Sequence, residues 1–160
     1  MLTGGSYSRS SDAIVPFRGF PEGKTRLAAL LSADQRVQLN RAMLHDVCTA
    51  LAGAALISSV TILSCDDSAA LEAQDLGVRF IQQPSSILGL NSAINHIQDM
   101  YKDSSALLII PADLPLITSS EIDRLVRAGS TNTRMVAIAP SFDGGTNGLM
   151  LKPPTIILTD

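Results

Sequence analysis

Aromatic residues, cysteines and long hydrophobic runs are scarce in this 160-residue sequence, and each scarcity excludes a class of protein. Aromatic residues make up 4% of the chain, Lys and Arg form no cluster, and the formal net charge is −3, so the sequence lacks the basic, aromatic surface of a nucleic-acid-binding protein. No apolar stretch approaches the roughly 20 residues of a membrane span, and the N-terminus has no basic-then-apolar signal pattern. We therefore expect a cytoplasmic protein that binds neither nucleic acid nor membrane.

The two cysteines, Cys48 and Cys65, stand far apart and form no C-x-x-C motif, which argues against a metal or redox site. The pattern puts Cys48 in a helix and Cys65 at the end of a strand, and we expect both to be buried, reduced thiols. The two histidines, His45 and His96, lie in helical segments without a third partner for a hydrolase triad. We expect structural roles for both histidines.

The sequence does contain enough hydrophobic residues to form a core. Hydrophobic residues make up 46% of the chain and charged residues 17%, which indicates a single globular domain. Short apolar runs alternate with helical segments, and this alternation predicts an α/β protein: a three-layer α/β/α sandwich around a mostly parallel, mixed sheet. We expect a flexible N-terminal tail over residues 1–11 and one domain over residues 12–160.

Periodicity and capping signals give the expected elements. Two helices begin at capping boxes, Ser32 to Gln35 and Thr118 to Glu121, and the second helix extends to about Ala128. Two further helices are expected at residues 68–74 and 90–101. Strands are expected at residues 13–15, 60–63, 78–81, 107–110, 135–139 and 148–151.

The most informative segment is the apolar run Leu107–Ile110, which ends at Asp113 between two prolines. Four consecutive large aliphatic residues predict a strand that is buried on both faces. Asp113 then emerges at the carboxyl edge of the sheet, where ligands bind in open α/β folds, and its carboxylate is suited to hold a divalent metal against phosphate oxygens. The alternative is a turn residue that caps the next helix.

A second polar segment, residues 15–27, follows the first expected strand. Gly19 and Gly23 allow backbone N–H groups to approach an anion, while Lys24 and Arg26 supply mobile positive charge, so the segment is suited to bind phosphate. Its spacing fits neither a Walker A loop nor a Rossmann fingerprint. The alternative is a solvated loop whose basic side chains face water.

A third polar segment precedes the last expected strand. Adjacent glycines are followed by Thr146 and Asn147, which offer a hydroxyl and an amide to the phosphate or carboxylate of a substrate. A hairpin turn is the alternative interpretation. The functional interpretation is favoured because all three polar segments adjoin strands that the α/β arrangement would bring side by side.

Five segments of the sequence together carry a resemblance to a known family. They are Pro16 with Lys24–Leu27, Leu44–Val47, Gly89–Ala93, Pro111–Leu116 and Gly144–Asn147. In kind and order they resemble the 2-phospho-L-lactate guanylyltransferase family, which serves biosynthesis of coenzyme F420 and includes bacterial enzymes that use phosphoenolpyruvate. The resemblance spans residues 13 to 157 and implies the GT-A-like nucleotidyltransferase fold.

The resemblance implies transfer of GMP from GTP to a small phosphorylated three-carbon acid, phosphoenolpyruvate or 2-phospho-L-lactate, with release of pyrophosphate. It implies Mg²⁺ as cofactor, with Asp113 as the metal ligand and with catalytic roles for Lys24, Arg26 and Asp113. The implied nucleotide-binding residues are Pro16, Phe17, Lys24, Arg26 and Asn91. The implied acceptor-binding residues are Gly145, Thr146 and Asn147.

Family members continue past the position of Asp160 with a Gly/Ser-containing loop and a later acidic residue that would share the metal, so we expect this domain to lack the family's C-terminal segment. Two other functions stay open: a nucleotidyltransferase of the same fold with a molybdopterin or sugar-phosphate acceptor, and a non-catalytic nucleotide-binding subunit. Enzymes for those acceptors usually begin with a Gly-rich loop, whereas this chain has Val15-Pro16-Phe17-Arg18. The sequence leaves the choice of phospho-acid and the formation of a homodimer open.

Overall fold

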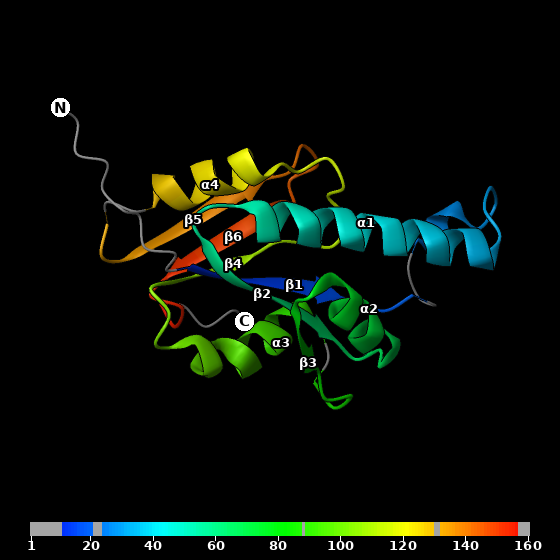
Figure 1. Cartoon of the computed structure of the whole chain (residues 1–160), viewed down its shortest axis with the longest axis horizontal. Coiled ribbons are helices and arrows are strands. Elements are labelled where there is room, and N and C mark those ends of the chain that lie inside the picture. The colour runs from blue at the N-terminus through cyan, green and yellow to red at the C-terminus, as the bar shows by residue number, and fades with distance from the viewer. Residues whose placement is uncertain (1–10, 21–23, 88, 130–131, 157–160) are drawn as a thin grey trace.

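The computed structural model describes residues 11–20, 24–87, 89–129 and 132–156. One sheet joins its strands in the order β3-β2-β1-β4-β6-β5 (Figure 1). Its elements are β1 (Ser11–Phe17), the 3₁₀ turn η1 (Thr25–Leu27), α1 (Ala33–Gly53), β2 (Ile57–Ser64), α2 (Ser68–Leu76), β3 (Arg79–Gln82), α3 (Leu90–Gln98), the 3₁₀ turn η2 (Asp99–Tyr101), β4 (Ala106–Ile109), α4 (Ser119–Ala128), β5 (Met135–Pro140) and β6 (Thr146–Lys152). β1 is parallel to β2 and β4, and β2 to β3, whereas β6 is antiparallel to β4 and β5. The predicted mostly parallel, mixed sheet is confirmed.

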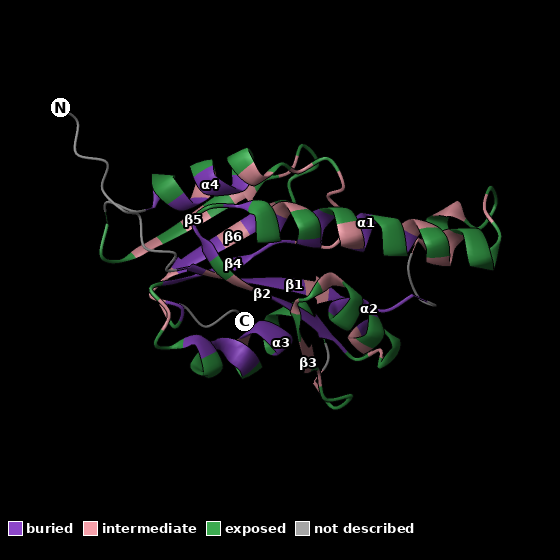
Figure 2. Ribbon diagram, in the orientation of Figure 1, coloured by how far each residue is buried: buried purple, intermediate pink, exposed green. Residues whose placement is uncertain are grey.

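Helices cover both faces of this sheet. Residues of α1, α2 and α4 share one core with alternate residues of β1 and β4, and α3 shares a second core on the opposite face (Figure 2). Leu108 of β4 belongs to the first core, and Leu107 and Ile109 to the second, as the two-residue period of a strand requires. All four residues of the predicted run Leu107–Ile110 are at most 4% exposed. The three-layer sandwich and its doubly buried strand are therefore confirmed.

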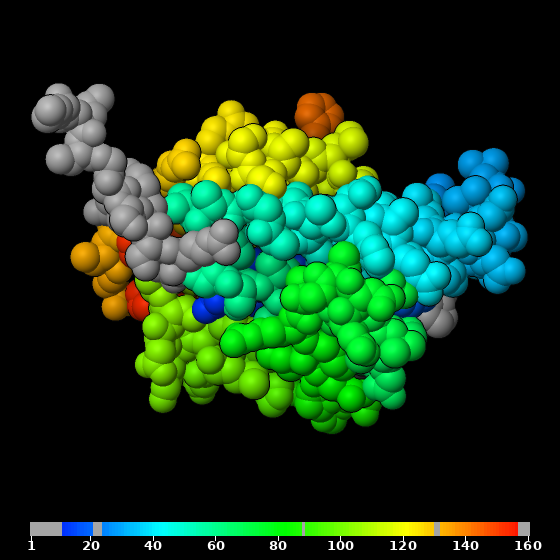
Figure 3. Space-filling model, in the orientation of Figure 1, coloured from blue at the N-terminus to red at the C-terminus, as the bar shows by residue number. Residues whose placement is uncertain are grey.

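The space-filling view shows how completely the helices screen the centre of the sheet. From the side drawn, α1 in cyan and α2 in green leave little of the dark blue β1 visible (Figure 3). Within the described ranges, no helix has the length and apolar character needed to cross a membrane.

Both predicted capping boxes are present. Ser32 Oγ accepts a hydrogen bond from the Gln35 N–H at 3.2 Å, and Gln35 Oε1 accepts one from the Ser32 N–H at 2.9 Å. Thr118 and Glu121 form the same reciprocal pair at the start of α4. These bonds satisfy N–H groups that have no partner within the helix, which explains why the helices begin where they do.

Several strand boundaries differ from the expected ones. β1 begins at Ser11, inside the expected tail, and the rest of that tail lies outside the described residues. β6 begins at Thr146, so Thr146 and Asn147 belong to a strand rather than to the turn before it. The physical reason is pairing with β5, which extends as far as Pro140 opposite Thr146. Such pairing depends on the partner strand and leaves no local signal.

A buried carboxylate ties α4 to the turn between α1 and β2, at the amino edge of the sheet. Asp123 is 9% exposed and accepts hydrogen bonds from the N–H groups of Leu56 at 2.9 Å and Ala55 at 3.2 Å. Hydrogen bonds to a charged group contribute more than neutral ones, and a buried N–H without a partner is costly. Asp123 therefore stabilises the fold at the edge of the sheet where the parallel strands begin.

We predict that Asp123→Ala lowers the free energy of unfolding by about 1.5–3 kcal/mol, because two N–H groups lose a charged acceptor. Urea denaturation followed by circular dichroism measures this difference. The control is Asp46→Ala at an exposed position of α1, which should stay within about 0.5 kcal/mol of the wild type. Equal losses in the two variants would contradict the assignment.

Candidate functional site

A cleft of about 990 Å³ opens at the carboxyl edge of the parallel strands. Its walls are formed by the loops after β1, β3 and β4, by Cys65 directly after β2, by η1 and by one side of α1. These segments are distant in the sequence and meet because parallel strands end at the same edge of a sheet. The volume lies within the range of about 300–1,000 Å³ that is typical of small-molecule sites.

Five of the sequence-predicted site residues line this cleft: Pro16, Phe17, Lys24, Arg26 and Asp113. Lys24, the N-cap residue directly before η1, has φ +58°, a left-handed conformation that is uncommon for a residue other than glycine. Arg26 is exposed in the same turn. Pro21 and Gly23 of the predicted phosphate-binding segment lie outside the described residues.

An ion pair joins the loop after β1 to the loop after β4. Lys24 Nζ lies 3.0 Å from Asp113 Oδ2, and the two side chains are 29% and 54% exposed. A pair this accessible to water contributes only about 0–1 kcal/mol to folding. Lys24 can therefore leave Asp113 to bind an anion, and Asp113 can leave Lys24 to bind a cation.

Asp113 carries a carboxylate of the kind that binds Mg²⁺. Mg²⁺ commonly takes one or two protein carboxylates and completes its shell with water and substrate phosphates. Asp113 offers one such carboxylate, partly exposed at the cleft. Across the ranges that the structure describes, no three His, Cys, Asp or Glu side chains gather into a metal cage.

Four sequence-predicted residues do not line the cleft. Asn91 is exposed in the first turn of α3, one residue beyond Leu90, which does line it. Gly145, Thr146 and Asn147 lie in the hairpin between β5 and β6. Because β6 is antiparallel to β4, this hairpin stands at the edge of the sheet where β4 ends, which is the edge that carries the cleft.

The turn of that hairpin is closed by its own hydrogen bonds. The Ser141 N–H donates to the Gly145 carbonyl at 2.9 Å, and the Gly144 N–H donates to the Ser141 carbonyl at 3.2 Å. The Asp143 carboxylate accepts from the Ser141 hydroxyl and from the Gly145 N–H, and these bonds hold its pKa below the usual value. The segment therefore has the hairpin geometry that was the alternative interpretation from the sequence.

Sequence reasoning missed the parts of the cleft that come from α1 and from the loop after β3. Asn40 and Met43 of α1 and Gln83 after β3 line it. Gln83 Nε2 donates to the Ile87 carbonyl at 2.6 Å, which shapes the loop. Residues 83–90 follow a strand, as the predicted segments do, and this position could have indicated that they line the cleft. No sequence pattern distinguishes the helix residues that line a cleft from other helix residues.

The prediction of buried thiols is confirmed for Cys48 and wrong for Cys65. Cys48 is buried in α1, and burial raises its pKa to about 12. Cys65 is exposed and lines the cleft, because it follows the last buried residue of β2, Ser64. Its thiol donates to the Arg18 carbonyl at 3.9 Å, and no disulfide joins the two cysteines.

Neither histidine lines the cleft. His45 Nε2 lies 2.7 Å from Glu72 Oε2, between α1 and α2. His96 is exposed near the end of α3. Both positions agree with the structural roles expected from the sequence.

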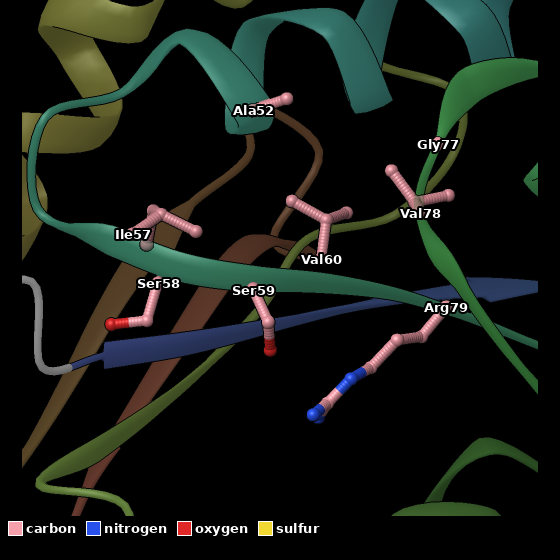
Figure 4. Close-up of a pocket in the computed structure, with 8 residues that line it drawn as sticks. All are labelled: Ala52, Ile57, Ser58, Ser59, Val60, Gly77, Val78 and Arg79. Atoms are coloured by element: carbon pink, nitrogen blue, oxygen red, sulfur yellow. The ribbon is translucent and has the colours of Figure 1, made fainter.

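A second pocket, of about 360 Å³, lies at the opposite edge of the sheet beside the amino ends of β2 and β3. Figure 4 shows Val60 and Val78 on one side of these strands and Ser59 and Arg79 on the other. The pairing of β2 with β3 begins only at Thr61 opposite Arg79, so the start of β2 has no strand beside it there. The pocket is a consequence of this offset, and no sequence-predicted site residue lines it.

A carboxylate from the end of β2 holds the loop after β1. Gly19 has φ +108°, and a Cβ at this position would lie 2.8 Å from Asp66 Oδ2, so only glycine fits here. The Phe20 N–H donates to the same oxygen at 3.0 Å, and Asp66 Oδ1 accepts from the N–H and hydroxyl of Ser68 at 3.0 and 2.6 Å. Partial burial acts to raise the pKa of Asp66, but the hydrogen bonds from Ser68 and Phe20 outweigh burial and hold this pKa below its usual value.

Solved structures share this arrangement of strands and helices. The chain matches a protein of Desulfovibrio desulfuricans G20, assigned as a nucleotide-diphospho-sugar transferase, with a TM-score of 0.74 and 21% identity over 92% of this chain and 65% of that one. It matches CMP:2-keto-3-deoxy-manno-octonic acid synthetase with a TM-score of 0.64 and 9% identity, over 92% and 76% of the two chains. The fold is that of the nucleotidyltransferases.

Sequence comparison identifies the family. The model of the family described as "Guanylyl transferase CofC like" matches residues 11–159. The chain is 38% identical over 148 residues to the phosphoenolpyruvate guanylyltransferase of Sphaerobacter thermophilus, which covers 91% of this chain and 70% of the relative. It is 34% identical over 147 residues to the 2-phospho-L-lactate guanylyltransferase of Methanothermobacter thermautotrophicus, over 91% and 64% of the two chains. The chain belongs to the CofC-like guanylyltransferase family and spans about two thirds of the length of these relatives.

We predict that the stability difference between the wild type and Asp66→Asn narrows as the solution becomes acidic. A carboxyl group whose pKa is lower in the folded than in the unfolded chain stabilises the fold above its unfolded pKa, and this contribution is lost as the pH falls through the folded pKa. The wild type should therefore be more stable than the variant at pH 7, and the two should converge below pH 3.8. Urea denaturation across this pH range measures the free energy of unfolding of both proteins. A difference between the two free energies that does not change with pH would refute the prediction.

Proposed function

We propose that this protein transfers GMP from GTP to phosphoenolpyruvate or 2-phospho-L-lactate in the biosynthesis of coenzyme F420. The observation that carries the proposal is the exposed Lys24–Asp113 pair, which lies at the carboxyl edge of a nucleotidyltransferase fold in a chain whose relatives are named for this activity. A cation and a carboxylate 3.0 Å apart supply partners for both components of a metal–nucleotide complex.

In the proposed reaction a phosphate oxygen of the acceptor attacks the α-phosphorus of GTP. The bond from this phosphorus to the oxygen bridging to the β-phosphate breaks, and pyrophosphate leaves with that oxygen and its electron pair. The products are a guanylylated acceptor, joined through a new phosphoanhydride, and pyrophosphate. Since no protein nucleophile takes part, the protein accelerates the reaction by positioning the reactants and neutralising charge.

The charged residues of the cleft divide these tasks in our proposal. Lys24 and Arg26 neutralise the negative charge that develops on the leaving pyrophosphate. Asp113 would hold Mg²⁺, which when bound supplies positive charge at the phosphate oxygens. Pro16 and Phe17, which line the cleft at the end of β1, border the nucleotide.

The four sequence-predicted residues that do not line the cleft also have roles in the proposal. Asn91, in the first turn of α3, offers its side chain to the nucleotide. Gly145, Thr146 and Asn147 contact the phosphate or carboxylate of the acceptor from the β5–β6 hairpin. Support for the hairpin roles comes from its position at the same edge of the sheet as Asp113.

We expect this chain to release pyrophosphate from GTP and Mg²⁺ only when phosphoenolpyruvate or 2-phospho-L-lactate is present. Mass spectrometry of the products identifies the guanylylated acceptor and so distinguishes the two phospho-acids. The relative from Sphaerobacter thermophilus serves as the positive control for the assay. A melting temperature raised by GTP, without pyrophosphate release with either acceptor, would instead indicate a non-catalytic nucleotide-binding protein.

We predict that Asp113→Asn lowers kcat by about 10²–10³-fold, because it removes a charged group at the reacting phosphates while preserving side-chain shape. The melting temperature should change little, because the Lys24–Asp113 pair is exposed. Asp103→Asn, at an exposed position in the turn before β4, is the matched control and should retain wild-type turnover. Full activity in Asp113→Asn would remove this residue from the proposed reaction.

A further inference from the structure

We infer that Asp66 is a positioning residue for the nucleotide-binding loop and acts through Phe20. The inference rests on the proposed function, because the loop concerned is the one proposed to bind GTP. Neither Asp66 nor Phe20 lines the cleft. Their contact therefore affects the nucleotide only through the adjoining residues 17–19, which do line the cleft.

Phe20 is fixed on four sides, although it stands in a loop. Its N–H donates to Asp66 Oδ2 at 3.0 Å, and its carbonyl accepts from Asn40 Nδ2 at 3.5 Å. Its ring meets that of Phe17 edge to face with centroids 4.8 Å apart, and the Arg41 guanidinium lies over it, 5.3 Å from the centroid. Phe20 is only 5% exposed. We call these five residues the Phe20 anchor.

The anchor is in turn held by α2. Arg41 Nε donates to Glu72 Oε1 at 2.7 Å, and the Glu72 side chain is 9% exposed and also contacts His45. Partial burial acts to raise the pKa of Glu72, but hydrogen bonds from His45 and Arg41 outweigh it and keep this pKa below its usual value. Glu72 therefore stays ionised at neutral pH and keeps Arg41 in place over the Phe20 ring.

The anchor adjoins the part of the loop that lines the cleft. Phe17, itself a member of the anchor, lines the cleft, and so do Arg18 and Gly19, the two residues between Phe17 and Phe20. Fixing Phe20 therefore fixes one end of this short segment. A displacement of about 1 Å is enough to lower the rate of a reaction that depends on positioning.

Asp66 is the member of the anchor that connects separate elements through one carboxylate. Oδ2 accepts from the loop at Phe20, and Oδ1 accepts from Ser68 at the start of α2. Gly19 packs against the same carboxylate with a left-handed backbone. Removing the charge of Asp66 should release the loop while leaving Lys24 and the other cleft side chains chemically unchanged.

The test compares Asp66→Asn with Asp123→Asn. In the wild type each carboxylate accepts hydrogen bonds from two backbone N–H groups, but Asp123 does so at the opposite edge of the sheet. Both variants should have lowered melting temperatures. Only Asp66→Asn should lower kcat/KM for GTP, by about 10–100-fold, with the KM for the acceptor within about twofold of the wild type.

A second variant separates the loop contact from the helix contact. Ser68→Ala removes one hydrogen bond to Oδ1 and leaves the Phe20 N–H bond to Oδ2 intact. It should keep the wild-type kcat/KM for GTP. Equal changes in GTP kinetics for Asp66→Asn and Asp123→Asn, or for Asp66→Asn and Ser68→Ala, would overturn the positioning role.

Calorimetric titration with GTP, without acceptor, distinguishes failure of this inference from failure of the proposed function. A Kd about tenfold weaker for Asp66→Asn, with Asp123→Asn unchanged, supports the positioning role whether or not turnover occurs. Equal affinity in the wild type and Asp66→Asn overturns the inference alone. A wild-type chain that binds no GTP overturns the inference and the proposed function together.

Discussion

Burial of the central strands on both faces is the constraint on which the rest of this structure depends. β1 and β4 place alternate apolar side chains in the two cores, so helices must cover both sides of the sheet. The chain therefore returns over the sheet after each parallel strand, and its strand-to-helix connections gather at one edge. The cleft is the space between those connections, and its position follows from the packing of the core rather than from any feature of the loops themselves.

The parts of the fold that depend on neighbours in the chain could be predicted from the sequence. The apolar run Leu107–Ile110 specifies a buried strand by itself, and each capping box marks a helix start through residues three positions apart. Asp113 and Lys24 could be predicted as cleft residues because both follow strands. The contact of Asp66 with Phe20 could not, because the two residues are 46 positions apart and neither position has a distinctive pattern. Cys65 and Thr146 were misplaced for the same reason, since the exposure of a strand end and the extent of a hairpin depend on what the fold brings beside them.

The proposed site combines two kinds of contact that differ in strength. The Phe20 anchor has a buried residue, Phe20, at its centre and is held by hydrogen bonds, ring contacts and an ion pair from α2. The Lys24–Asp113 pair is exposed and weak, and it ends the same loop. This combination suits a ligand-binding loop. The anchored residues are ordered when the protein folds, so binding a ligand does not require the entropic cost of ordering them. The weak ion pair can exchange partners when the ligand binds.

The Lys24–Asp113 pair also has a consequence for the form of the nucleotide in the proposed function. The two side chains neutralise each other, so a ligand that engages Lys24 alone leaves the Asp113 carboxylate facing phosphate oxygens. Like charges at such short range repel each other, and the repulsion grows as water is displaced from between them. A nucleotide that already carries a divalent cation avoids this conflict, because it presents a partner to each side chain. In the proposed function, the ion pair would therefore favour binding of the metal–nucleotide complex over binding of the free nucleotide.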